Sequence, residues 1–220
     1  LYEKVKEKNE LPKTAAIPIP AFIKVFQKHV DNGDEVIYTG ISKQMSRTFE
    51  NAILAAREVD ESKIFLVDSM SLSTGIGLLL LKACKYRDSG MSANEIKVQL
   101  EIDRTKVLSQ FVIETMDYLH KGGRCSGMAK IVGTLLKIKP MISVRDGKMH
   151  VAKKPHGKMQ VALNIMIDQL KNDLPRLDKS VVIIDYKTYM VDINLNYLPY
   201  GLSMQLPVYL YLTKNLDKDY

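Results

Sequence analysis

The sequence has 220 residues, of which 46% are hydrophobic and 26% are charged, a balance typical of globular proteins. Its length is enough to bury a core in one or two domains without disulfides. The longest apolar run, residues 76–81, ends at Lys82 and is far shorter than the roughly 18 residues that a membrane span needs. This excludes a transmembrane helix. No signal-peptide pattern is present, so we expect a cytoplasmic protein. The chain begins at Leu1 and not at Met, and we expect residues to precede it.

The net charge of +7 is unevenly distributed along the chain. Residues 179–220 contain four Lys and four Asp and no other charged residue, so the basic excess lies before this segment. A basic balance is compatible with nucleic acid or an acidic partner. The lysines are scattered over predicted helix faces, which favours an ordinary solvated surface.

The cysteines do not form a metal-binding pattern. Cys84 and Cys125 have no ligand spacing with each other or with the four histidines. We therefore expect two reduced thiols, with a disulfide as the alternative, and no metal or other cofactor.

Apolar periodicity predicts alternating helices and strands over the first two thirds of the chain. The predicted helices cover residues 20–30, 46–58 with Ser46 as cap, 71–87, and 92–102 with a Ser92–Glu95 capping box. The predicted strands between and after them cover residues 35–41, 64–67 and 108–113. Further along, the predicted elements are short helices at 115–120 and 126–136, a hairpin of strands 138–144 and 148–152 around Asp146-Gly147, and a helix at 156–174.

This alternation predicts an α/β fold with a parallel sheet, followed by the start of a second, mixed sheet. In open α/β sheets, ligands bind beyond the carboxyl ends of the strands. That rule selects the loops at residues 41–46, 68–77 and 115–126. The first two are rich in neutral hydroxyl groups, which suit an anion: Ser42, Ser46, Thr48, Ser69, Ser71, Ser73 and Thr74.

A catalytic or nucleotide-binding use of these loops has weak support. No histidine that could activate a serine lies in the hydroxyl-rich loops. The segment from Ser73 to Gly77 lacks the Lys of a phosphate loop and the third Gly of a dinucleotide fingerprint. We expect Gly75 and Gly77 to allow close helix packing instead.

Five blocks, in this order and spacing, resemble the DegV family over residues 1–178. They are Leu11-Pro12-Lys13-Thr14; Ile41-Ser42 with Met45-Ser46-Arg47-Thr48-Phe49; Val67-Asp68-Ser69 with Ser73, Gly75 and Gly77; Tyr118-Leu119-His120-Lys121-Gly122-Gly123-Arg124; and Gly133-Thr134-Leu135-Leu136 with Ile138-Lys139-Pro140 and Asp146-Gly147.

The resemblance implies a DegV-like protein that is not an enzyme and that carries a long-chain fatty acid in a buried apolar tunnel. It implies a first parallel α/β domain at residues 1–115, N-terminally truncated, and the start of a second mixed α/β domain at 116–178. The family's carboxylate-binding hydroxyls fall on Thr14 and Ser46, and Arg124 is a nearby positive charge or docking residue. The implied partner is the ATP-binding subunit of a fatty acid kinase, which phosphorylates the carried acid.

The sequence departs from the family at two places beside these residues. Ala15-Ala16-Ile17 follows Thr14 where the family has Ser-Gln-Pro, which removes a hydroxyl and an amide. Arg47 stands where a Gly commonly follows the serine, so it would either crowd the loop or place a charge near the carboxylate.

Residues 179–220 differ in composition, with seven of the eleven tyrosines in the last 35 residues. They resemble a strand–helix fragment of the PD-(D/E)xK nuclease module of AddAB-type helicase-nucleases. Under this alternative, Asp185 binds Mg²⁺, Lys187 stabilises negative charge, and Gln205 and Tyr209 orient the centre on a nucleic acid. The two resemblances do not belong to one known protein, so we expect a chimera or a misassembled reading frame. The acidic residues that should precede Asp185 are missing, so we expect the nuclease part to be inactive. A truncated chain without any competent site is the third interpretation.

Overall fold

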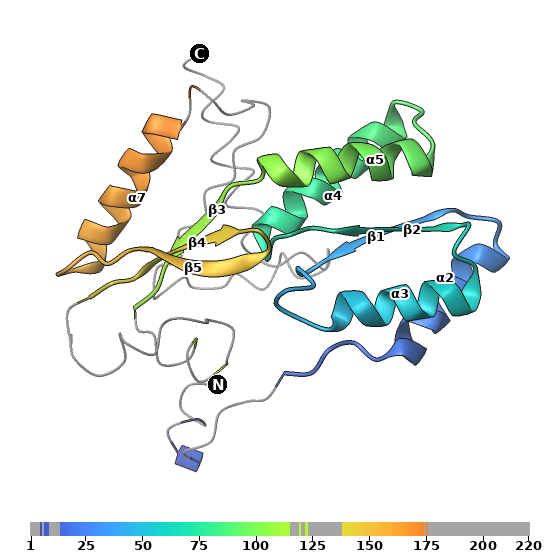
Figure 1. The fold of residues 1–220 in the computed structure, drawn as a ribbon, viewed down its shortest axis with the longest axis horizontal. Coiled ribbons are helices and arrows are strands. Elements are labelled where there is room, and N and C mark those ends of the chain that lie inside the picture. Colours follow the sequence, from blue (N-terminus) through green and yellow to red (C-terminus); the bar gives the residue numbers. More distant parts are fainter. Residues whose placement is uncertain are drawn as a thin grey trace, which may run out of the picture.

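The computed structural model describes residues 14–114 and 138–173, together with residues 5, 7, 8, 119, 122 and 175. Two small sheets lie side by side, each with its own helices (Figure 1). One sheet is parallel and the other antiparallel, which confirms the predicted α/β architecture. The second sheet was predicted to be mixed, but its described strands are all antiparallel.

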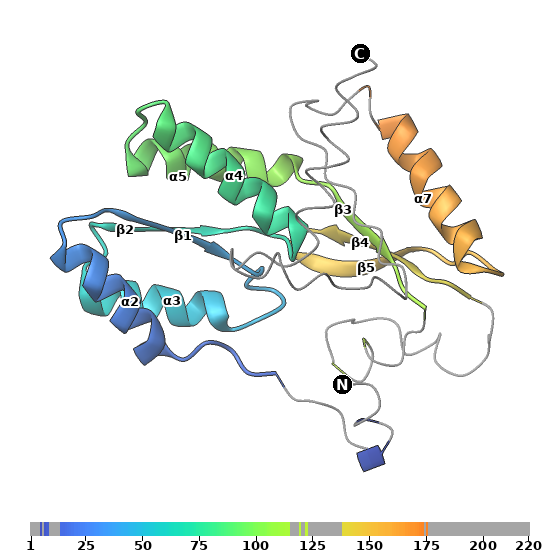
Figure 2. The same cartoon turned by 180° about the vertical axis from the view of Figure 1, so that it is seen from behind.

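The first sheet pairs β1 (Val36–Gly40) with β2 (Ile64–Asp68) in parallel, and Gly40 stands opposite Asp68 at its carboxyl edge. Helices α2 (Ile19–Asp31) and α3 (Thr48–Val59) cover one face, and α4 (Thr74–Asp88) and α5 (Ala93–Asp103) cover the other (Figures 1 and 2). This layering fits the apolar β strands, which bury side chains on both faces.

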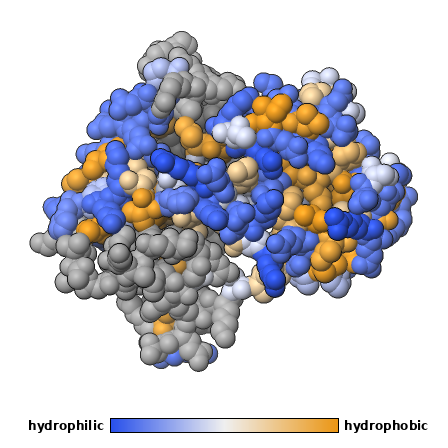
Figure 3. Space-filling model, in the orientation of Figure 1, coloured by the Kyte–Doolittle hydropathy of each residue, from blue (hydrophilic) through white to orange (hydrophobic). Residues whose placement is uncertain are grey.

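Each face of the first sheet has its own apolar core. Under α2 and α3 the buried residues are Phe22, Phe26, Ala52, Ala55, Ala56 and Ile64. Under α4 and α5 they are Val67, Leu79, Ala83, Ile96 and Leu100. Burying a large aliphatic or aromatic side chain contributes about 1.5–3 kcal/mol, so these clusters are the main stabilising term of the layer. Hydrophobic residues also remain among hydrophilic ones on the surface of the helices that cover the first sheet (Figure 3).

The second sheet is antiparallel and has the order β3 (Ser109–Val112), β4 (Met141–Arg145) and β5 (Lys148–Lys153). A short 3-10 turn, η1 (Arg104–Lys106), links α5 to this sheet, and α7 (Met159–Asp173) follows it. The β4–β5 turn has positive φ at Asp146 (50°) and Gly147 (73°), which is the backbone conformation that a two-residue hairpin loop requires. The predicted hairpin is therefore confirmed.

Helix starts show where the sequence pattern was less accurate. Ser46 was predicted as the cap of α3, but the helix begins at Thr48 with Arg47 at the cap position, and the Ser46 hydroxyl accepts the Thr48 N–H at 3.2 Å. Helix α4 begins at Thr74 rather than at residue 71, because Ser73, inside the predicted helix, has a positive φ (49°) that breaks the helical path. The Ser92–Glu95 capping box of α5 is confirmed.

The predicted helices at 115–120 and 126–136 lie outside the described residues, apart from Leu119. Strand β3, predicted within the first domain, pairs with β4 of the second sheet. The division of the chain near residue 115 and near residue 179 stays a prediction.

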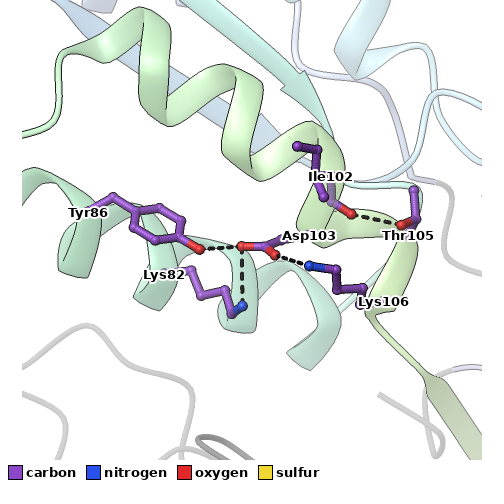
Figure 4. Close-up of polar contacts among 6 residues, drawn as sticks. All are labelled: Lys82, Tyr86, Ile102, Asp103, Thr105 and Lys106. Carbon is purple, nitrogen blue, oxygen red and sulfur yellow. Dashed lines mark hydrogen bonds and ion pairs between the residues drawn. The ribbon is translucent and has the colours of Figure 1, made fainter. Parts of the chain in front are cut away.

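A buried carboxylate ties α5 to α4. Asp103, at the end of α5, has a side chain only 3% exposed, and it receives the Tyr86 hydroxyl at 2.5 Å (Figure 4). The ammonium groups of Lys82 and Lys106 lie 3.2 Å from its two oxygens. Burial raises the pKa of Asp103, but the hydrogen bonds from Tyr86, Lys106 and Lys82 together outweigh it and lower this pKa below its ordinary value of 3.8.

We expect Asp103→Asn to lower the free energy of unfolding by about 1.5–3 kcal/mol at neutral pH, because hydrogen bonds to a charged group are lost. The folded pKa is lower than the ordinary value of 3.8 expected in the unfolded chain, so the carboxylate stabilises the fold above pH 3.8 and loses this effect as the pH falls through the folded pKa. Urea unfolding of wild type and Asp103→Asn at pH 7 and at lower pH values measures the lost stability and its dependence on pH. The control is Asp88→Asn, which removes an exposed pair with Arg87 and is expected to change stability little. Equal effects of the two substitutions would contradict the assignment.

Candidate functional site

The two hydroxyl-rich loops meet at the carboxyl edge of β1 and β2. The N–H of Ser42 donates to the carbonyl of Ser71 at 2.9 Å, and the N–H of Lys43 donates to a carboxylate oxygen of Asp68 at 3.3 Å. Ser42, Ser69 and Ser71 are buried. The structure thus brings together two of the three loops that the sequence selected. The third, at 115–126, lies outside the described residues except for Leu119 and Gly122.

Ser46 lies at the end of the first loop, immediately before α3. Its N–H donates to the carbonyl of Ser42 at 3.1 Å. Its hydroxyl accepts the N–H of Thr48 and lies 2.9 Å from the Thr48 hydroxyl, with either oxygen able to donate. Ser46 is half-buried, and the pair sits at the positive end of the α3 dipole, which favours an anion.

The segment that carries Thr14 is fastened to the same helix start. The Ile17 N–H donates to the Thr48 hydroxyl at 3.3 Å, and the Asn51 side-chain amide donates to the Ile17 carbonyl at 2.7 Å. Thr14 itself is exposed and precedes Ile17 by three residues. Sequence reasoning included Thr48 among the hydroxyls but missed Asn51. The only available signal was their i, i+3 spacing in the first turn of a helix.

The departure at residue 47 is resolved by the direction of its side chain. Arg47 is 87% exposed, and its Nε lies 3.8 Å from the carboxylate of Glu50 on the next helical turn. The side chain therefore extends into solvent and does not crowd the loop. Arg124 and the residues of the alternative metal site, Asp185, Lys187, Gln205 and Tyr209, lie outside the described residues.

An apolar cluster lies between the first loop and the second sheet. Met45, next to Ser46, is buried with Ile142 of β4 and Met149 of β5. Partly buried side chains packed against these three are Ile41, Leu72, Phe111, Ile113, Leu119, Val144 and Val151. A polar edge therefore lies directly beside an apolar interior, and the junction falls between Met45 and Ser46.

Close approaches of small residues join the two sheets at this edge. A side chain at Gly147, in the β4–β5 turn, would meet the Ser42 hydroxyl. A side chain at Gly75 would meet the hydroxyls of Ser71 and Ser109, which are 3.0 Å from each other. Gly75 therefore allows close packing as predicted. For Gly77 that expectation stays a prediction, because no described atom lies within 4 Å of the position a side chain would take.

Comparison with known proteins identifies the family. The model of the DegV family, described as "Uncharacterised protein, DegV family", matches residues 1–191. This chain belongs to the DegV family. A DegV domain-containing protein of Clostridium perfringens is 30% identical over 216 residues, covering 94% of this chain and 77% of that protein.

Two solved DegV proteins share the fold and are described by what they bind. A DegV family protein from Thermus thermophilus, described by its fatty acid binding, has 27% identity and a TM-score of 0.69 over 77% of this chain. DegV from Bacillus subtilis, described as a fatty acid binding protein, has 29% identity and a TM-score of 0.68 over 80% of this chain. The match spans 60% and 62% of those two chains, which is less than two thirds of their length.

These matches give the nuclease resemblance no support. The DegV model passes the expected boundary at residue 179 and includes Asp185 and Lys187. Within residues 14–114 and 138–173, no three His, Cys, Asp or Glu side chains gather as a metal site would require. Among the described helices, none has the length and apolar character needed to cross a membrane.

We expect Gly147→Ala to cost more stability than Gly33→Ala. Both glycines have positive φ (73° and 85°), so both substitutions incur a left-handed backbone penalty of about 1–2 kcal/mol. Only at residue 147 must the new methyl group displace the Ser42 hydroxyl, which accepts the Gln44 N–H at 3.2 Å; no described atom lies within 4 Å of the Gly33 position. The additional cost is about 0.5–1.5 kcal/mol, the net value of one hydrogen bond. Urea unfolding of the two variants checks this, and equal costs would show that the turn does not press on the loop.

Proposed function

We propose that this protein is a non-enzymatic carrier that binds one long-chain fatty acid and presents its carboxylate to a fatty acid kinase. The observation that carries the proposal is the Ser46–Thr48 hydroxyl pair at the start of α3, directly beside the apolar cluster of Met45, Ile142 and Met149. Membership of the DegV family, with solved relatives described as fatty acid binding proteins, supports it.

The hydroxyl pair has one donor left for a carboxylate. The Thr48 oxygen accepts the N–H of Ile17, and the Ser46 oxygen accepts the N–H of Thr48. The hydrogen bond between the two hydroxyls uses one of their two hydrogen atoms. We assign the other hydrogen to a carboxylate oxygen of the ligand, with the Thr14 hydroxyl as a second donor from the segment that Thr48 and Asn51 hold in place.

The acyl chain supplies most of the binding energy in this proposal. Each buried methylene contributes about 0.8 kcal/mol, so a long chain outweighs one or two neutral hydrogen bonds. We place its first carbons against Met45, where the polar edge meets the apolar cluster. The thioethers of Met45 and Met149 adapt to different chain shapes, which suits a ligand without fixed geometry.

The carrier role, rather than catalysis, follows from the groups at the edge. The described hydroxyls bond to one another and to backbone groups, and no histidine of the described residues joins them. We assign Arg124 to the docking of the kinase subunit, which supplies ATP and the phosphoryl-transfer chemistry. A cytoplasmic location is part of the same proposal.

Native mass spectrometry of the protein purified from a bacterial host tests the carrier role. We expect a non-covalent adduct with the mass of an acid of about 16 to 18 carbons, because a chain of that length gains about 0.8 kcal/mol for each methylene that it buries. The adduct should disappear after delipidation and return when the acid is added. A folded protein that carries no adduct and takes up none would refute the proposal.

Ser46→Ala tests the head-group assignment. The substitution removes one neutral hydrogen bond, so we expect fatty acid binding to weaken by about 0.5–1.5 kcal/mol. The matched control is Ser92→Ala, which removes the capping box of α5 and costs about 0.5–2 kcal/mol of stability. It should leave the affinity unchanged. Titration of the delipidated variants with the acid measures both, and an unchanged affinity of Ser46→Ala would remove Ser46 from the site.

A further inference from the structure

The buried carboxylate of Asp68 connects the two loops of the site. Asp68 ends β2 and is 6% exposed. One of its oxygens receives the N–H of Lys43 from the loop after β1, at 3.3 Å, and the N–H of Met70 from its own loop, at 3.1 Å. The Asp68 carbonyl receives the guanidinium of Arg104 at 3.0 Å, which fixes the backbone from the α5 side.

The bond to Lys43 acts on a peptide group that also holds Ser46. The N–H of Lys43 and the carbonyl of Ser42 belong to the same planar peptide unit, so the orientation of one sets that of the other. That carbonyl accepts the N–H of Met45 at 2.9 Å and the N–H of Ser46 at 3.1 Å. A rotation of this peptide would break the bonds at both ends.

The bond to Met70 shapes the second loop in the same way. Met70 has a φ of 51°, an uncommon value for a residue with a side chain, and the Asp68 carboxylate accepts its N–H two residues along the chain. The turn places the Ser71 carbonyl where it accepts the N–H of Ser42 at 2.9 Å. The same buried Asp68 oxygen thus accepts an N–H from each loop, so a single side chain holds both loops.

We propose that Asp68 is a positioning residue for the ligand's head group: through the Ser42–Lys43 peptide it fixes the backbone of Ser46, and thereby the direction in which the Ser46 hydroxyl meets the carboxylate. Asp68 bonds to the backbone and does not contact the ligand. The inference rests on the proposed function for its ligand, but its hold on the Ser46 backbone is a property of the free protein.

Three substitutions at residue 68 separate geometry from charge. Asp68→Asn keeps an acceptor oxygen at the same position, and we expect its fatty acid affinity to stay within about threefold of wild type. Asp68→Glu keeps the charge but moves the oxygens by one methylene, and Asp68→Ala removes them. We expect both to bind about tenfold more weakly, because Ser46 then loses its fixed direction. Amide hydrogen exchange of the ligand-free proteins should be faster at Ser46 in the Asp68→Glu and Asp68→Ala variants than in wild type, and unchanged along α5.

A second buried carboxylate provides the control. Asp103→Ala removes a carboxylate that ties α4 to α5 and makes no contact with the described loop residues 41–46 in its hydrogen bonds and ion pairs. It should lower stability and leave affinity and Ser46 exchange unchanged. If Asp68→Ala does not fold, the proposal is decided by whether Asp68→Asn binds the fatty acid more tightly than Asp68→Glu.

The outcomes distinguish the two proposals. Equal affinities and equal Ser46 exchange in wild type, Asp68→Glu and Asp68→Ala overturn the positioning role and leave the carrier function standing. Affinity retained in Asp68→Glu but lost in Asp68→Asn also overturns it, because charge and not geometry would then matter. A wild-type protein that binds no fatty acid refutes the carrier function, while the exchange at Ser46 still decides whether Asp68 holds that backbone.

Discussion

The parallel register of β1 and β2 is the constraint on which the site depends. With Gly40 opposite Asp68, β1 and β2 end at the same edge of the sheet. The first residues of the two following loops can therefore form hydrogen bonds with each other's backbone. A shift of one residue would turn the Asp68 side chain to the opposite face of the sheet. Its carboxylate could then no longer accept the N–H of Lys43. The site is therefore a consequence of strand pairing, and the hydroxyl groups become useful only because the pairing brings their loops together.

Much of the architecture could be predicted from sequence because it depends on local patterns. Apolar periodicity located both parallel strands and the helices between them, and the Ser92–Glu95 spacing identified the start of α5. The Asp146-Gly147 pair located the hairpin turn, since both residues tolerate positive φ. The rule that ligands bind beyond the carboxyl ends of parallel strands selected the two loops that do meet.

The connections within the site could not be predicted in this way, because they join residues far apart in the chain. Asn51 holds the carbonyl of a residue 34 positions earlier, and Asp68 holds an N–H 25 positions earlier. The predicted start of α4 was wrong for a related reason. Apolar periodicity assigned Ser71 to α4, but the Ser71 carbonyl accepts the N–H of Ser42 and its hydroxyl bonds to that of Ser109. Because its polar groups are used in this way, α4 begins only at Thr74.

The choice of neutral donors has a consequence for how a carried acid would be used. A lysine or arginine paired with the carboxylate would bind the head group more tightly, but the same attraction would reduce the tendency of the oxygen to attack a phosphorus atom. In the described loop after β1, the charged side chains of Lys43 and Arg47 are exposed, whereas Ser42 is buried and Ser46 is half-buried. In the proposed site, hydroxyl groups would orient the carboxylate oxygens at a modest energy, while the buried methylenes would supply the affinity. In the carrier that we propose, this division of roles would keep the acid bound by its tail and leave its head group reactive.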